Sequence, residues 1–309
     1  MRAVTLDAFD VAPALRDDLP DPTAAADGLV VRVHASSINP VDNAIAAGML
    51  REMVAHEFPI VLGRDYAGTV ESAGAEVDGY AVGDDVFGFL LHANPTVHQG
   101  SWAESIAVTP ELQIAPKPAS LDFAAAGAAP LAGITALAAA DALALSEGAT
   151  ILIVGATGGV GSFAVQLAAR AGATIVAPAL AEDADYLRSL GVTQQLDRDG
   201  DVAAAVRDLH PDGVDALLDL VSYAPGLYDG ALKDGARVAS PIGAAGEGPG
   251  RTNVMAVPSE DNLRRLAALL DDGTLRVHLH ETFELDRAAD ALKALATGHV
   301  RGKLAISVR

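Results

Sequence analysis

Residues 151–180, ILIVGATGGVGSFAVQLAARAGATIVAPAL, contain the pattern that decides the fold. An apolar run leads into a cluster of glycines, a helix-like stretch follows, and a second apolar run begins at Thr174. This order predicts a strand, a tight turn, a helix and a second parallel strand, which is the unit of a dinucleotide-binding fold. The candidate residues for contact with a pyrophosphate are Gly155, Ala156, Thr157, Gly158, Gly159, Val160 and Gly161.

Small residues are required in this turn for geometric reasons. Ala156 fills the first glycine position of the dinucleotide pattern, and Gly158 and Gly161 fill the other two. The chain must turn sharply, let its backbone approach the pyrophosphate and pack the next helix against the sheet. A helix over 159–171 would aim its N-terminal N–H groups at the phosphates. A tight turn without a ligand is the alternative interpretation, whereas a P-loop is excluded because no lysine followed by serine or threonine closes the motif.

The end of the second apolar run bears on the choice between NADPH and NADH. NAD-binding folds carry an acidic residue there for the ribose 2′-hydroxyl, about 20 residues after the glycines. This chain has Ala177-Pro178-Ala179-Leu180, so we expect NADPH rather than NADH, with Ala177 among the contacts. Against this, three acids follow at 182–185. The nearest cation is Arg188, which is either a phosphate clamp or a solvated surface residue.

Length and composition restrict the classes of protein. A chain of 309 residues is long enough for two domains. With 41 acidic and 21 basic residues, its charge argues against a nucleic-acid or anionic-membrane surface. The absence of cysteine excludes disulfides, thiolate catalysis and cysteine-ligated zinc. The start, MRAVTLDAFD, has no signal-peptide pattern, so we expect a cytoplasmic protein. The uncharged stretch 123–140 contains Pro130 and many alanines, and we expect buried helices there rather than a membrane span.

The pattern of the chain changes near residue 120. Up to Lys117, short strand-like runs alternate with glycine and proline turns, which is typical of a partly open β-barrel. From Leu121 onward, helical periods alternate with apolar strands, which predicts an α/β doubly wound parallel sheet. The last segment, 283–309, reads as an amphipathic helix, a turn and a strand, and these could extend either domain.

Several phrases in this order resemble the medium-chain dehydrogenase/reductase superfamily, and most of all its zinc-free quinone oxidoreductase branch, which includes zeta-crystallin. They include SSINPVDNAIAAGM (36–49), FPIVLGRDYAGTVESAG (58–74), the glycine cluster and GKLAISV (302–308). The resemblance implies a GroES-like barrel as catalytic domain, 1–117 with 276–309, and a Rossmann domain, 118–275. It also implies a cofactor in the cleft between these domains, and commonly a homodimer.

Two departures from the zinc-dependent alcohol dehydrogenases of this superfamily bear on the metal. Those enzymes hold zinc with a cysteine, a histidine in a Gly-His-Glu phrase, and a further cysteine or acid. This chain has Asn39 at the cysteine position and Gly63-Arg64-Asp65 in place of the histidine phrase. The resemblance therefore implies no zinc. His278 and His280 would share one face of a strand, and a solvated edge explains them better than a metal.

Without a metal to polarise a carbonyl, the favoured acceptor is one that stabilises its own negative charge. A quinone does so as a phenolate, and an α,β-unsaturated carbonyl (enone) as an enolate. The protein then mainly orients the reactants and supplies donors to the developing oxyanion. We therefore expect an NADPH-dependent reductase of a quinone or enone. The alternatives are an NADP-binding structural or regulatory relative with low turnover, and an enoyl reductase that acts on acyl thioesters.

Three residues are catalytic candidates because they match family phrases. Asn39 and Asp42 match an Asn-x-x-Asp phrase near the nicotinamide, and the Asn39 amide could donate to the substrate. Alternatively, this turn caps the following helix, a role that fits Asp42 well. Arg64 replaces a metal ligand, and it either pairs with Asp65 or presents a cation to the substrate.

The resemblance is incomplete at two tyrosines that are common in this branch. Their positions are occupied here by Ala44 and Leu50, which puts a tyrosine donor and simple quinone specificity in doubt. Tyr66 is a candidate substitute donor if it faces the cleft.

Further cofactor contacts are implied by matching positions and by the carboxyl edge of the sheet, where open α/β proteins bind ligands. Thr135 is either close to the nicotinamide phosphates or a buried threonine bonded to its own helix. Lys303 matches a recurrent lysine, although a surface lysine at the start of a strand is the ordinary interpretation. The remaining candidates are Val221, Ser222, Tyr223, Ile242, Gly243, Met255 and Val257.

Overall fold

The structure, a computed structural model, describes residues 1–53, 55–90, 100–109 and 113–309. The chain divides into two compact units. The first comprises Met1–Leu131, Val257–Gly273 and Val277–Arg309, and the second comprises Ala132–Ala256 and Thr274–Arg276. Each unit contains its own cluster of buried apolar side chains.

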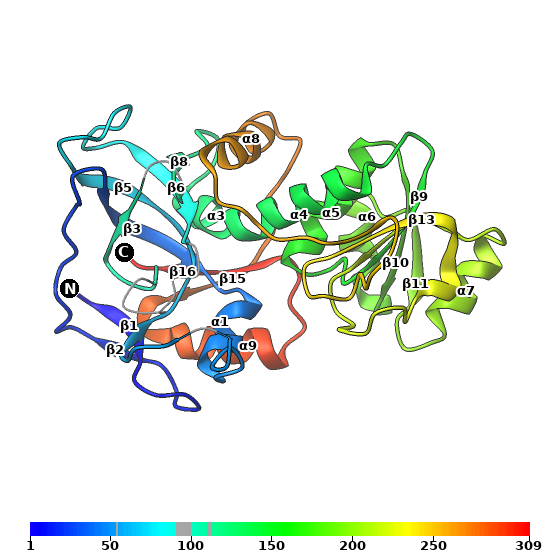
Figure 1. Ribbon diagram of the computed structural model, residues 1–309, viewed down its shortest axis with the longest axis horizontal. Helices are drawn as coiled ribbons and strands as arrows, with labels where there is room; N and C mark the ends of the chain where they lie inside the picture. The colour runs from blue at the N-terminus through cyan, green and yellow to red at the C-terminus, as the bar shows by residue number, and fades with distance from the viewer. Residues whose placement is uncertain (54, 91–99, 110–112) are drawn as a thin grey trace. The chain divides into compact units, whose positions relative to one another are not determined.

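The first unit is built on a curved, mainly antiparallel sheet (Figure 1). Its strand order is β15-β16-β3-β5-β6-β8, β7 pairs with β3, and β2-β1-β4 form a smaller sheet. The bounds are β1 Ala3–Leu6, β2 Ala14–Arg16, β3 Leu29–Ser37, β4 Ile60–Val61, β5 Asp65–Ala73, β6 Asp85–Phe89, β7 Ser105–Val108, β8 Ala115–Pro116, β15 Leu279–Glu284 and β16 Lys303–Ser307. The predicted GroES-like barrel is confirmed, and the C-terminal strand β16 joins it through β3.

Within the described part of the first unit, the α-helices are α1 Pro40–Ala46, α3 Phe123–Ala128, α8 Glu260–Asp271 and α9 Ala288–Thr297. The division into units differs from the boundaries expected from the sequence, because α3 and α8 group with the barrel. Helix α3 packs on β3 and β5. Ser120 links this region to α8, since its N–H donates to Asp271 at 2.9 Å and its hydroxyl donates to the Leu270 carbonyl at 3.3 Å.

The second unit is a parallel sheet of six strands in the order β11-β10-β9-β12-β13-β14. This order reverses direction between β9 and β12, as in the classical Rossmann fold, so the predicted doubly wound sheet is confirmed. The bounds are β9 Thr150–Val154, β10 Thr174–Ala179, β11 Gln194–Asp197, β12 Val214–Asp219, β13 Leu232–Ser240, β14 Arg251–Asn253, α4 Pro130–Leu143, α5 Gly159–Arg170, α6 Ala184–Leu190 and α7 Val202–Leu209.

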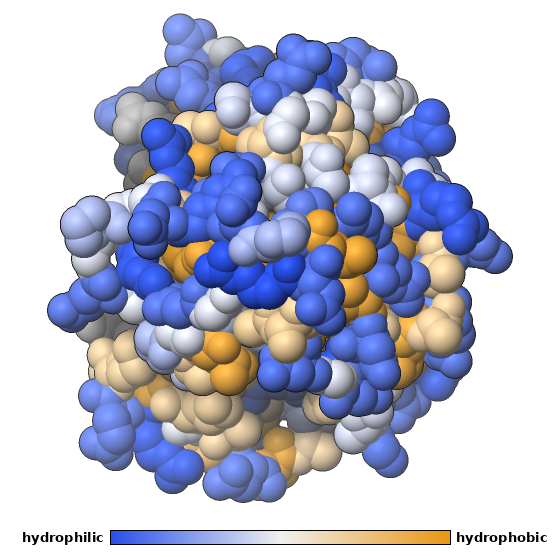
Figure 2. Space-filling view, turned by 90° about the vertical axis from the view of Figure 1, so that its right-hand side faces the viewer, coloured by the Kyte–Doolittle hydropathy of each residue, from blue (hydrophilic) through white to orange (hydrophobic). Residues whose placement is uncertain are grey.

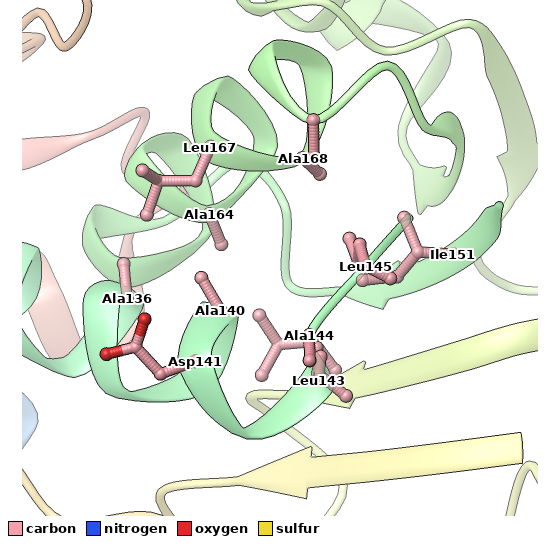
Figure 3. A pocket seen from close by; sticks show the side chains of 12 residues that line it. Ala136, Ala140, Asp141, Leu143, Ala144, Leu145, Ile151, Ala164, Leu167 and Ala168 are labelled. Atoms are coloured by element: carbon pink, nitrogen blue, oxygen red, sulfur yellow. The ribbon is translucent and has the colours of Figure 1, made fainter. Parts of the chain in front are cut away.

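The uncharged stretch 123–140 forms α3 and most of α4, so the expected helices are confirmed. Among the described residues, no helix is both long enough and apolar enough to cross a membrane. Between α4 and α5 lies an apolar groove of about 300 Å³. Its walls are largely alanines, with Ala136 and Ala140 on one helix and Ala164 and Ala168 on the other (Figure 3). The groove exists because these side chains are too small to fill the space between the helices.

The outer surface fits the acidic composition. The face in Figure 2 is mostly hydrophilic, and its apolar side chains form separate patches rather than one continuous surface. The chain as a whole has a formal net charge of −20.

Candidate cofactor and catalytic sites

The glycines of the loop after β9 have three different structural roles. Gly155 has a φ of +89°, and a Cβ there would lie 2.6 Å from a methyl carbon of Val221. At Gly161 a Cβ would lie 2.1 Å from the Gly155 carbonyl oxygen, so the close packing of helix and loop requires glycine. Gly158 is different, because its backbone is extended and a Cβ would meet only the Gly155 oxygen, at 3.6 Å. The space beside the backbone of Gly158 is therefore not filled by the protein.

Helix α5 begins directly after Gly158. Gly158 is the N-cap, and its carbonyl accepts the first helical hydrogen bond, from Ser162 N–H at 2.8 Å. The N–H groups of Gly159, Val160 and Gly161 belong to the first turn, where a helix offers no carbonyl acceptors of its own. Free N–H groups and the helix dipole together favour an anion. The glycine loop and the first turn of α5 thus lie together where the sequence predicts pyrophosphate binding.

The loop after β12 is fixed in conformation by Asp219, which is 1% exposed. One carboxylate oxygen accepts from the N–H of Val221 at 3.0 Å and of Ser222 at 2.9 Å, and the other accepts from the Ser222 hydroxyl. Tyr223 then has a φ of +51° and is 70% exposed. Such a φ is uncommon for a residue other than glycine, and it is typical of functional positions. Asp219 was not among the residues predicted from the sequence, where its signal is an acid at the end of an apolar strand.

The other predicted cofactor residues are spread over several elements, and some are buried whereas others are exposed. Thr135 is buried in α4, and Ala177 is buried inside β10 rather than at its end. Arg188 is exposed on α6 and forms an ion pair with Asp185 at 2.6 Å. The remaining four lie after β13 or β14: Ile242, Gly243 with φ +83°, Met255 at 79% exposure and Val257 at 52%, the last in the first unit.

In the first unit, Lys303 is buried rather than exposed, so its interpretation as a surface lysine is wrong. It is 4% exposed, and its ammonium donates to the Asn39 side-chain oxygen at 2.6 Å and the Ile38 carbonyl at 3.1 Å. It also forms an ion pair with Asp65 at 3.4 Å. Burial lowers the pKa of Lys303, and Asp65 opposes this shift. Lys303 therefore organises a buried polar cluster with Ser37, Asn39, Asp42, Arg64 and Asp65.

Asp65 is the main acceptor of this buried polar cluster. Its Oδ2 accepts from Ser37 and, at 2.8 Å, from the Asn39 amide, while its Oδ1 accepts from the N–H of Leu131 at 2.7 Å. The second amide hydrogen of Asn39 has the Ser37 hydroxyl at 3.4 Å. Because the amide is engaged on both sides and Asn39 is 4% exposed, the structure gives no support to Asn39 as a donor to the substrate.

Asp42 has the capping role that the sequence offered as an alternative. Its Oδ2 accepts from the N–H of Asn39, the N-cap of α1, at 2.8 Å. Its Oδ1 is buried without a hydrogen-bond partner among the described residues. Arg64, which is 4% exposed, interacts electrostatically with Asp42. Asp65 forms its ion pair with Lys303. The cluster therefore contains two acids and two cations.

The titration of Asp42 should make stability depend on pH. Burial raises its pKa to about 6 from an ordinary 3.8. The folded state then binds this proton more tightly than the unfolded chain, so the free energy of unfolding should fall as pH rises from about 4 to about 6. The loss is on the order of 3 kcal/mol, of which roughly half falls above pH 5. Urea unfolding of the parent and Asp42→Asn at pH 5 and 7.5 should show this difference. A parallel pH dependence in the two proteins would contradict it.

Tyr66 does not support the role of a substitute donor. It is completely buried in β5, and its hydroxyl donates to the carbonyl of Gln113 at 2.8 Å. Burial raises the pKa of this hydroxyl well above its usual range. Tyr66 is therefore a core residue whose polar end already has an acceptor.

The side chains at the positions where zinc-dependent alcohol dehydrogenases hold their metal do not fit zinc in this protein. Zinc requires three or four converging ligands from cysteine, histidine or carboxylate. The corresponding residues are Asn39 and Arg64, and the ammonium of Lys303 lies beside Asn39. Two buried cations would repel a third. Within the described parts of the chain, no group of three or more histidine and acidic side chains is placed to hold a metal ion.

Comparisons with known proteins identify families and relatives that this chain resembles. Residues 25–119 match the family described as alcohol dehydrogenase GroES-like domain, and residues 190–306 match zinc-binding dehydrogenase. An NADPH-dependent alkenal/one oxidoreductase of Arabidopsis thaliana is 31% identical over 301 residues, covering 94% of this chain and 75% of that protein. A 2-methylene-furan-3-one reductase of Solanum lycopersicum is 30% identical, covering 94% and 74%.

A solved structure extends the likeness to the whole fold. The quinone oxidoreductase from Coxiella burnetii superposes with a TM-score of 0.87 at 29% identity, covering 100% of this chain and 99% of that one. The agreement thus includes both units, the glycine loop and the barrel. The chain belongs to the medium-chain dehydrogenase/reductase superfamily, in its quinone oxidoreductase-like branch, and is an oxidoreductase.

Proposed function

We propose that this protein is a zinc-independent reductase that transfers a hydride from NADPH to a quinone or an enone. The observation that carries the proposal is the space at Gly158, which lies at the N-terminus of α5 and at the carboxyl end of β9. This is where a Rossmann fold holds the pyrophosphate of a nicotinamide dinucleotide.

The residues of the second unit fit such a cofactor. The first-turn N–H groups of α5 would bind the pyrophosphate, and Gly158 would let it approach the backbone. Asp219 positions the loop that carries Val221 and Tyr223 at the same carboxyl edge. When bound, the reduced nicotinamide supplies the hydride.

The acceptor class is proposed from the chemistry of the barrel unit. The Asn39 amide and the Tyr66 hydroxyl are already engaged within the protein, and the polar cluster does not fit zinc. An acceptor that delocalises its own negative charge can be reduced without a metal ion and with few hydrogen-bond donors from the protein. Two relatives whose names specify an alkenal/one and a furan-3-one support this class. A cytoplasmic homodimer remains part of the proposal.

The test is turnover with a labelled cofactor. Purified protein should oxidise NADPH in the presence of a naphthoquinone or a short-chain enone, and deuterium at C4 of NADPH should appear on carbon in the reduced enone. Dialysis against a chelator should leave the rate unchanged.

Other outcomes separate the alternatives. Tight binding of NADPH without turnover of any acceptor would favour a structural or regulatory protein. Faster reduction of enoyl thioesters than of free enones or quinones would favour an enoyl reductase.

A further inference from the structure

The sheet register places a cation beside the position that selects between NADPH and NADH. Strands β10 and β11 are parallel, and Ala179 is aligned with Asp197. The next residues, Leu180 and Arg198, therefore leave neighbouring strands at the same edge. In dinucleotide-binding folds, the end of the second strand faces the 2′ position of the adenosine ribose. Arg198 is ten residues further along the sequence than Arg188, but the register brings it next to this position.

A hollow of about 490 Å³ lies at this edge. The small side chains of the loop after β10 keep it open, and Gln195 ties that loop to β11 by donating to the Leu180 carbonyl at 2.6 Å. The residues that line the hollow are Ala179, Ala181, Ala184, Gln195, Leu196 and Asp197. There is therefore room beside the end of β10 for a phosphate-sized group.

The two arginines near this edge differ in how their guanidinium groups are used. Arg188 forms a hydrogen-bonded ion pair with Asp185 at 2.6 Å, one turn away on the same helix. Arg198 lies 3.7 Å from Asp199, which is longer than a hydrogen bond, and its side chain is 48% exposed. The planar guanidinium of Arg198 thus keeps donors available for bidentate contact with a phosphate.

We propose that Arg198 recognises the 2′-phosphate of NADPH and is the residue that makes the protein prefer NADPH over NADH. The inference rests on the proposed function. Because Asp197 lines the hollow and Glu182 and Asp199 are close to its lining residues in the sequence, a phosphate dianion would be repelled without a cation. Asp197 lines the hollow, and its carboxylate could accept a hydrogen bond from a free 2′-hydroxyl. Removal of Arg198 should therefore weaken NADPH selectively rather than weaken both cofactors.

The experiment compares the affinities of the parent, Arg198→Ala, Arg198→Lys and Arg188→Ala for NADPH, NADH and adenosine 2′,5′-bisphosphate by calorimetry. Arg198→Ala should weaken NADPH and the bisphosphate by about 10- to 100-fold, the range for a charged hydrogen-bonded contact. Its affinity for NADH should change less than threefold. Arg198→Lys should fall between the parent and Arg198→Ala, because a lysine keeps the charge without the bidentate geometry.

Several results would overturn the inference. Equal weakening of NADPH and NADH by Arg198→Ala would indicate a structural effect, and a phosphate-selective loss in Arg188→Ala instead would assign the role to Arg188. A parent protein that prefers NADH would refute the role of Arg198 while leaving hydride transfer intact. A parent that binds neither cofactor would refute the proposed function itself.

Discussion

Replacement of Gly158 by alanine is expected to weaken dinucleotide binding at least tenfold while changing the free energy of unfolding by less than about 1 kcal/mol. The backbone of Gly158 has φ −77° and ψ −177°, which alanine adopts without strain. The new Cβ would meet only the Gly155 oxygen at 3.6 Å. The loss of a good N-cap and the reduced entropy of the unfolded chain nearly offset each other. A ligand that approaches this backbone closely would, however, collide with the new methyl group.

Gly161→Ala is the matched contrast for this prediction. Its Cβ would lie 2.1 Å from the Gly155 oxygen and 2.7 Å from the Cα of Ala156, so loop and helix must separate. This variant should lose roughly 1–3 kcal/mol of stability, as overpacked sites do, together with cofactor binding. The measurements are a fluorescence titration with NADPH and urea unfolding of both variants. Unchanged affinity in Gly158→Ala would show that no ligand approaches this backbone.

Local pattern was sufficient to predict the parts of the molecule that rest on neighbouring residues. The glycine cluster, the strands on either side of it and the doubly wound parallel sheet follow from periodicity and from small residues at fixed offsets. The same holds for the cap at Asn39 and Asp42, because the bond from Asn39 N–H to the Asp42 carboxylate joins residues three apart.

Roles that depend on distant segments were not predictable in this way. Lys303 is buried because its acceptors come from the start of α1 and from β5, more than 230 residues earlier in the chain. A lysine that opens a strand reads as a surface residue until those acceptors are placed. The position of Arg198 beside the end of β10 was not predictable either, since it depends on the register between β10 and β11. Tyr66 has a donor group, and only the fold shows that Gln113 accepts from it.

The buried ion pair of Lys303 leads to the largest expected effect on stability. Lys303→Met removes the cation but leaves Asp65, which is completely buried, with its charge. Removal of one partner of a buried pair typically costs 3–5 kcal/mol, because the remaining charge is not compensated. Asn39 would also lose the donor 2.6 Å from its side-chain oxygen. We therefore expect Lys303→Met to lower the free energy of unfolding by about 3–5 kcal/mol in urea titrations.

Lys233→Met is the matched control. It also removes an ion pair, but the two charged groups are closer together than in the Lys303 pair and more exposed to solvent. Lys233 and Asp215 are 2.6 Å apart, and their side chains are 38% and 37% exposed. Solvent screens such a pair, so the expected cost is below about 1 kcal/mol. Adding Asp65→Asn to Lys303→Met should recover part of the loss, since the uncompensated charge is then gone. If Lys303→Met costs no more than Lys233→Met, burial of the cluster does not determine its strength; if the double variant recovers nothing, the loss comes from packing rather than from charge.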